Sequence, residues 1–361
     1  MVESNGYDCE EHWVITKDGY VLNVLRIPLG RFVGCRKARN RPPVLLQHGM
    51  LLDARSWMLL PPKRSLPFNL ADNGYDVWLV NSRGTEYSEG HTSLNNYDPA
   101  YWNWSWDELV AYDLPATFQY VYNQTGQKLH FVGHSQGTLM VMAAMSRDQL
   151  LNMLRSAALL CPIAYLRHTT SLLARFITDN FIAEVKPYPA FFLIYPNLIT
   201  MRTLKIICRI PSVDCSNMFT PYTGQNCCIK RSKTEIFLDH QPQPTAMKNV
   251  IHMCQMVRRG TLTMYDYNDC DENIKHYGQP TPPAYNMTCI PNDLPIFLSY
   301  GGADALSDVN DVKLLLDCLK HHDPGKIVVQ CIESYAHADY LMAEKAKEDV
   351  YDPLIAFLNK L

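Results

Sequence analysis

A serine flanked by two glycines carries the clearest chemical signal in the sequence. It stands at the centre of the pentapeptide Gly133-His134-Ser135-Gln136-Gly137. An apolar run at 129–132 predicts a strand before it, and residues 138–145 predict a helix after it. Gly-x-Ser-x-Gly in this context is typical of a tight turn that exposes the serine hydroxyl, with glycines that prevent collisions. We therefore expect Ser135 to be a nucleophile and His134 to pack within the turn.

A nucleophilic serine needs a base to take its proton and a carboxylate to orient that base. Two later residues meet these needs in the chain order serine, acid, histidine. Asp304 follows a predicted strand at 294–300 and a glycine-containing turn, and His337 follows the next predicted strand at 326–332. The sequence therefore predicts a triad of Ser135, Asp304 and His337.

Other acids and histidines compete for these two roles. Two aspartates just after Asp304 could serve as the acid, although both look like the first residues of a helix. Two competing histidines precede a strand, at the wrong end of the sheet, and two others fall in a long insertion. The competitors are Asp308, Asp311, His321, His322, His252 and His276.

Attack on a carbonyl also requires two N–H donors for the developing oxyanion. We expect one from the backbone of Gln136, the residue after the nucleophile. The other is expected from Met50, in the turn that follows a predicted strand at 43–47. In that turn Gly49 allows close approach of the backbone, whereas the alternative for His48 and Gly49 is an ordinary turn that ends a strand.

Predicted strands and helices alternate around these residues. A hairpin is expected near the N-terminus, where two β-rich runs flank residues 17–19. The later strands are almost continuously apolar, which is typical of a mostly parallel sheet with helices on both faces. Together with the order of the triad, this pattern predicts an α/β-hydrolase fold, with functional groups at the carboxyl ends of the strands.

One long segment interrupts the alternation. Residues 164–293 are rich in proline, aromatic residues, methionine and cysteine, and they exceed any ordinary connection between a strand and a helix. We expect them to form a mainly helical cap or lid domain, inserted between core parts at 1–163 and 294–361. Within the insertion, the aromatic and proline-rich run 187–196 is either packing between cap helices or a wall that contacts lipid.

Composition excludes several classes of protein. The chain has 361 residues, of which 47% are hydrophobic and 19% charged, and its net charge is −3. Without a basic run or a nucleic-acid motif, nothing favours a nucleic-acid partner. No apolar stretch reaches the length of a membrane span. The spacings of cysteine and histidine favour no metal site, and the predicted chemistry requires no cofactor.

Cysteine content and sequons point to the secretory pathway. Twelve cysteines are more than a reducing compartment usually requires. Cys208 and Cys215 could close a loop with Cys227 or Cys228. No signal peptide is visible, and we expect that one has been removed. The sequence has glycosylation sequons at Asn103, Asn123 and Asn286.

With these residues in view, the chain resembles the acid lipase family of α/β-hydrolases, which includes gastric and lysosomal lipases. The segments that carry the resemblance are 11–20, 46–50, 81–84, 112–117, 131–138 and 301–304. The amino-acid sequences of 276–286 and 299–302 resemble the plant branch called triacylglycerol lipase 2-like. By position, the resemblance implies the same triad and the same oxyanion amides. It also implies that the insertion covers an apolar acyl-binding cleft.

These observations predict a serine hydrolase that cleaves apolar carboxylic esters through an acyl-enzyme, and the resemblance implies acylglycerols as its substrates. The partners expected are an apolar ester or lipid and a transient lipid interface reached through the cap. An alternative is an acyltransferase, or an esterase for one dedicated small molecule, with the same triad. A non-catalytic lipid-binding protein on this scaffold would show a broken triad, and none is seen here.

Overall fold

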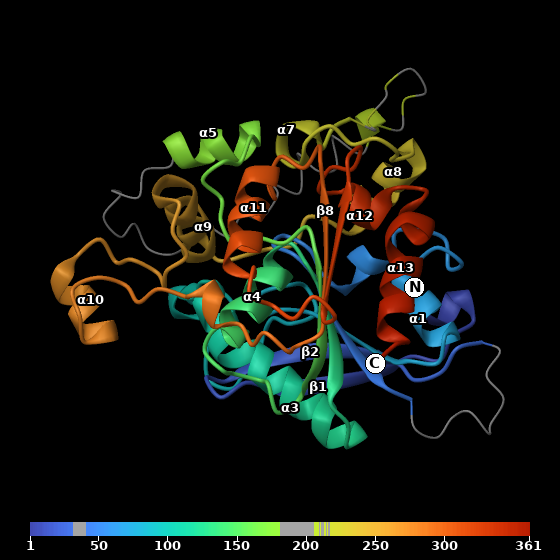
Figure 1. Cartoon of the computed structure of the whole chain (residues 1–361), viewed down its shortest axis with the longest axis horizontal. Coiled ribbons are helices and arrows are strands. Elements are labelled where there is room, and N and C mark those ends of the chain that lie inside the picture. Colours follow the sequence, from blue (N-terminus) through green and yellow to red (C-terminus); the bar gives the residue numbers. More distant parts are fainter. Residues whose placement is uncertain (32–40, 181–205, 209, 211–212, 214, 216) are drawn as a thin grey trace.

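The computed structural model describes residues 1–31, 41–180, 206–208, 210, 213, 215 and 217–361 (Figure 1). The predicted aromatic run 187–196 lies outside these residues. Within them, no helix combines the length and the apolar character that a membrane crossing requires.

A nine-stranded sheet forms the centre of the fold, in the order β1-β2-β4-β3-β6-β7-β8-β9, with β5 paired to β2. The hairpin strands β1 and β2 are antiparallel to their neighbours, and the pairs from β4 to β9 are parallel. The strands are β1 (Glu10–Ile15), β2 (Tyr20–Ile27), β3 (Pro43–Gln47), β4 (Asp76–Val80), β5 (Gly90–His91), β6 (Leu129–His134), β7 (Leu154–Leu160), β8 (Ile296–Gly301) and β9 (Ile327–Ile332).

Helices cover both faces of the sheet, so each face has its own hydrophobic core. One core contains Phe131 of β6 and the other contains its neighbour Val132, because successive side chains of a strand point to opposite faces. The first face is covered by α2 (Trp106–Glu108), α3 (Leu114–Thr125), α4 (Gln136–Met145) and α11 (Val309–Cys318) (Figure 1). The second is covered by α1 (Leu66–Asp72), α12 (Asp339–Met342) and α13 (Asp352–Leu358).

The described parts of the segment between β7 and β8 consist of helices joined by loops. It contains α5 (Leu172–Asn180), α7 (Thr220–Thr223), α8 (Arg231–His240), α9 (Met247–Arg259) and α10 (Cys270–Tyr277). In Figure 1, α5, α7 and α8 lie along the top of the molecule, and α10 projects at its left edge.

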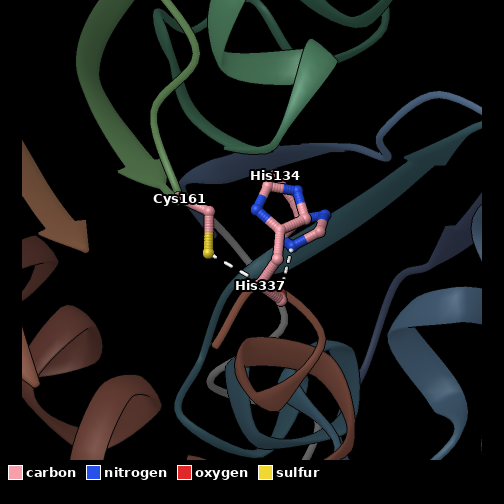
Figure 2. Close-up of side chains that lie close together, drawn as sticks. All are labelled: His134, Cys161 and His337. Atoms are coloured by element: carbon pink, nitrogen blue, oxygen red, sulfur yellow. Dashed lines mark hydrogen bonds between the residues drawn. The ribbon is translucent and has the colours of Figure 1, made fainter. Parts of the chain in front are cut away.

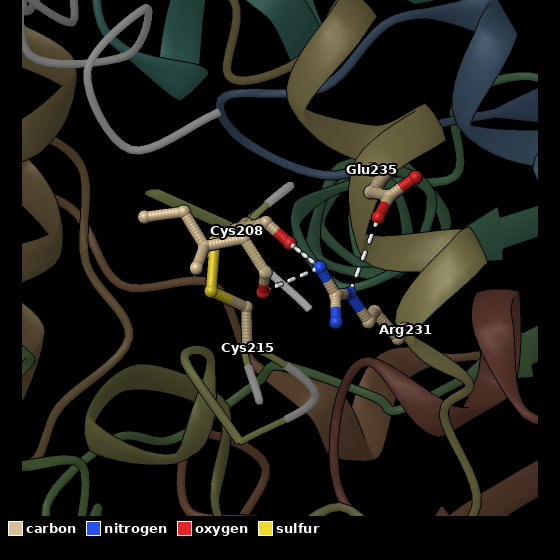
Figure 3. Close-up of a disulfide and its surroundings, with 5 residues drawn as sticks. Cys208, Cys215, Arg231 and Glu235 are labelled. Atoms are coloured by element: carbon tan, nitrogen blue, oxygen red, sulfur yellow. Dashed lines mark hydrogen bonds and ion pairs between the residues drawn. A yellow bond between two sulfur atoms is a disulfide. The ribbon is translucent and has the colours of Figure 1, made fainter. Parts of the chain in front are cut away.

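Two disulfides lie in this insertion, and they decide a pairing that the sequence left open. Cys208 bonds to Cys215, and Cys227 bonds to its neighbour Cys228. The cross-link between Cys208 or Cys215 and Cys227 or Cys228, which the sequence left open, does not form, because each cysteine finds its partner within its own short loop. Arg231 of α8 reinforces the first loop by donating to the carbonyl of Cys208 (Figure 3).

Candidate active site

Ser135 occupies a strained turn between β6 and α4. Its φ of 56° and ψ of −122° place a non-glycine residue at positive φ. The flanking glycines are required by space, since a Cβ at Gly137 would lie 2.5 Å from the carbonyl oxygen of Gln47, and one at Gly133 would lie 2.8 Å from the backbone of Gly137. The turn therefore has the tight geometry that the pentapeptide predicts, with Ser135 partly exposed.

Asp304 and His337 lie at the ends of two neighbouring strands, β8 and β9, and their side chains meet. His337 Nδ1 lies 2.8 Å from Asp304 Oδ2. The other carboxylate oxygen, Oδ1, accepts the backbone N–H groups of Leu306 and Ser307, both at 2.8 Å. Both side chains are buried, and His337 Nε2 has no hydrogen-bond partner among the described residues. The imidazole is thus oriented by a fixed carboxylate, and its second nitrogen is available.

The backbone of His337 is held from the nucleophile side. His134 Nε2 donates to the His337 carbonyl at 3.1 Å, and the Cys161 thiol donates to the same oxygen at 3.7 Å (Figure 2). Burial lowers the pKa of His134 well below its ordinary value, so its ring is neutral and its Nε2–H serves this bond. Potential metal-ligand atoms of these three residues lie within 4.8 Å of one another. Because two of them already bond one carbonyl, we assign the cluster to fixing the histidine loop.

The loop after β3 approaches the nucleophile closely. A Cβ at Gly49 would lie 2.8 Å from Ser135 Cβ, so only glycine fits there without displacement. His48 fixes this loop, since its Nε2 accepts the Ser82 N–H at 3.1 Å and its Nδ1 lies 2.8 Å from the Gly49 carbonyl. Met50 follows directly. The other predicted donor, Gln136, is the first residue of α4, whose N–H has no partner within a helix.

The insertion supports this loop and the serine turn, a role that sequence reasoning missed. Gln243 donates its backbone N–H to the Leu51 carbonyl at 2.7 Å. The side chain of Gln136 donates to Asn249 Oδ1 of α9 at 2.9 Å. Both contacts join residues more than a hundred positions apart, so no local pattern signals them.

An apolar cavity opens onto these residues. Met50, Ser135 and Gln136 line it, and its volume is about 80 Å³. Core and insertion both contribute to its apolar wall, which includes Ile163, Leu166, Ile177, Val250, Met253, Val257 and Leu306.

The competing acids and a competing histidine have other partners. Asp308 caps α11, and Asp311 pairs with His168 at 2.8 Å. His252 stacks on Trp106 with ring centroids 4.3 Å apart. The structure thus brings Asp304 and His337 together and places these alternatives elsewhere.

Comparison with known proteins identifies the family of the chain. Residues 1–60 match the family described as partial alpha/beta-hydrolase lipase region, and residues 42–192 match the alpha/beta hydrolase fold. Triacylglycerol lipase 2 of Arabidopsis thaliana is 46% identical over 98% of this chain and 85% of its own length. Gastric triacylglycerol lipase of Bos taurus is 36% identical over 99% of this chain and 90% of its own.

Solved structures show the same fold at low sequence identity. A soluble variant of monoglyceride lipase from Saccharomyces cerevisiae, in complex with a substrate analog, superposes with a TM-score of 0.59 and 14% identity, covering 100% of this chain and 97% of that one. The chain belongs to the acid lipase family of α/β-hydrolases, as the motifs had indicated.

Proposed function

We propose that Ser135, His337 and Asp304 are the catalytic triad of this hydrolase and that acylglycerols are its substrate class. The observation that carries the proposal is the buried His337–Asp304 pair, whose free Nε2 belongs to a histidine fixed by the serine turn. The apolar cavity beside Ser135 supports an acyl chain as ligand. The names of the relatives support a glycerol ester.

In this mechanism, the Ser135 oxygen bonds to the ester carbonyl carbon while His337 Nε2 takes the hydroxyl proton. Asp304 keeps the imidazole oriented and stabilises its positive charge. The N–H groups of Met50 and Gln136 donate to the oxyanion. His337 returns the proton to the leaving alcohol, and then removes one from the water that attacks the acyl-enzyme. The acid leaves, and Ser135 regains its proton.

The insertion, residues 164–293, is proposed as a cap over this site. Its helices α5 and α9 supply walls of the cavity, and α5 also presents apolar side chains to solvent. Such a surface fits transient contact with a lipid interface. The two disulfides and the exposed sequon asparagines support a location in the secretory pathway.

The test compares wild type with Ser135→Ala on p-nitrophenyl esters of increasing chain length and on emulsified triacylglycerol. Removal of the nucleophile is expected to reduce kcat by about 10⁴-fold or more, with an unchanged circular dichroism spectrum. Wild-type activity on short soluble esters alone would contradict the acylglycerol assignment. Ester products formed with an added alcohol would favour acyl transfer, and serine-independent turnover would overturn the triad.

A further inference from the structure

A buried carboxylate outside the triad lies two residues after His337. Asp339 is fully buried and accepts three backbone N–H groups. The donors are Ala336 at 2.8 Å, Cys227 at 3.1 Å and Cys228 at 3.3 Å. One of these residues precedes His337 directly, and the other two belong to the insertion. Asp339 therefore joins the histidine loop to a distant part of the chain.

The same stretch of the insertion also contacts the loop of the acid. The carbonyl of Thr223 accepts the N–H of Ala305 at 3.2 Å and the N–H of His337 at 3.2 Å. Residues 223–228, which we call the clamp segment, thus bond the neighbour of Asp304 and the backbone of His337. Its far end is fixed to the core as well, since Glu344 donates its N–H to the Cys228 carbonyl at 3.2 Å.

The disulfide within the clamp segment lies at the point where Asp339 is bound. A bond between the sulfurs of adjacent residues restricts the backbone between them, and such cross-links act mainly by removing alternative conformations. Here the restricted backbone presents both N–H groups to one carboxylate. Buried carboxylates with charge-assisted hydrogen bonds to the backbone hold loops more firmly than neutral groups do.

We propose that Asp339 is a positioning residue for His337, and that the Cys227–Cys228 pair keeps the clamp segment in the form that Asp339 binds. The inference rests on the proposed function, because it assigns a role to the loop of the proposed base. Asp339 does not touch the reacting atoms. It acts by fixing the backbone on either side of the imidazole, so that the 2.8 Å contact between His337 and Asp304 is maintained.

The first variants are Asp339→Asn and the double variant Cys227→Ser/Cys228→Ser. An asparagine turns one acceptor oxygen into an NH₂ group that faces backbone donors, so at least one of the three bonds is lost. We expect each variant to lower kcat on a soluble short-chain ester 10- to 100-fold, with KM changed less than twofold. Matched controls are Asp323→Asn, a carboxylate that caps a turn at the opposite end of the sheet, and Cys208→Ser/Cys215→Ser, which removes the other disulfide.

A second readout reports the His337–Asp304 bond without turnover. The proton on His337 Nδ1 is expected to give a downfield ¹H NMR signal in wild type that broadens or disappears in both test variants and persists in both controls. Wild-type kcat and an unchanged signal in the test variants would overturn the inference. If Asp339→Asn does not fold, the cysteine double variant decides by the same two measurements. Wild-type enzyme without Ser135-dependent turnover would contradict the proposed function. In that case the His337 Nδ1 proton signal, compared between wild type and the test variants, would still decide whether Asp339 positions His337.

Discussion

Asp107 shows how a single buried carboxylate can make the stability of this protein depend on pH. It lies in α2 of the core and accepts the Tyr265 N–H at 2.7 Å and the Tyr285 hydroxyl at 2.8 Å, both from the insertion. Burial outweighs these bonds and raises the pKa of Asp107 to about 7. A charged Asp107 is therefore costly in the folded state, at the junction between core and insertion.

The sign of the effect follows from proton binding. Because the folded protein binds this proton more tightly than the unfolded chain, the contribution of Asp107 to stability is lost as pH rises from about 4 to about 7. We predict that Asp107→Asn, which carries no charge, gains stability relative to wild type over that range, by up to about 4 kcal/mol. Urea unfolding at pH 4.5 and pH 8 measures the difference. The exposed Asp317→Asn is the control, and equal pH dependence in wild type and Asp107→Asn would contradict the prediction.

Within the site, the residues that follow strand ends could be predicted from the sequence. The contact between Asp304 and His337 could be expected because each follows an apolar strand, and neighbouring parallel strands end at the same edge. The bond from His134 to the His337 carbonyl gives no such signal, since it joins residues 203 positions apart. His134 was expected only to pack within the turn, and its bond to the His337 backbone emerged from the structure.

At the scale of elements, α5 has apolar side chains on both sides. One side lines the cavity through Ala174 and Ile177. The other exposes Leu172, Leu173 and Phe176, with 72%, 44% and 59% of their surface in solvent. A helix in contact only with water would place polar residues there. The outer side of α5 therefore fits a lipid surface.

The triple variant Leu172→Ser/Leu173→Ser/Phe176→Ser tests this contact. We predict about tenfold slower hydrolysis of emulsified triacylglycerol, because less apolar area is buried at the interface. Hydrolysis of a short soluble ester should stay within twofold of wild type. Trp13→Ser/Ile15→Ser removes comparably exposed apolar side chains from β1 and should leave both activities unchanged. Equal losses on both substrates would show that α5 acts on the site itself.

Core elements were predicted more closely than those of the insertion. The strand expected at 43–47 matches β3 at both ends, since buried parallel strands are short apolar runs bounded by turns. The insertion was expected to be mainly helical, and α9 is one of its helices. The sequence could not show that the insertion bonds the loop after β3 and the loop that contains His337, because backbone hydrogen bonds between distant segments leave no periodic pattern.

For the molecule as a whole, the class of fold followed from alternation and chain order, whereas the disulfide pairing did not. Sequence spacing permits several pairings among Cys208, Cys215, Cys227 and Cys228. Only the folded backbone decides between them, by bringing the Cα atoms of Cys208 and Cys215 to 5.6 Å. The insertion is therefore cross-linked within its own loops, and its attachment to the core depends on hydrogen bonds and packing.

The three glycosylation sequons lie on the protein surface. Asn103, Asn123 and Asn286 are all exposed, and none lines the cavity beside Ser135. Expression through a eukaryotic secretory pathway should therefore add up to three N-glycans without loss of ester hydrolysis. Each Asn→Gln variant should remove one step from the mobility shift that an endoglycosidase produces on a gel. Asn286→Gln should also lower stability slightly, because Asn286 accepts the Thr288 N–H at 3.1 Å. Secreted, active protein with no endoglycosidase shift would contradict glycosylation at all three positions and would leave the disulfides as the sole structural support for a secretory location.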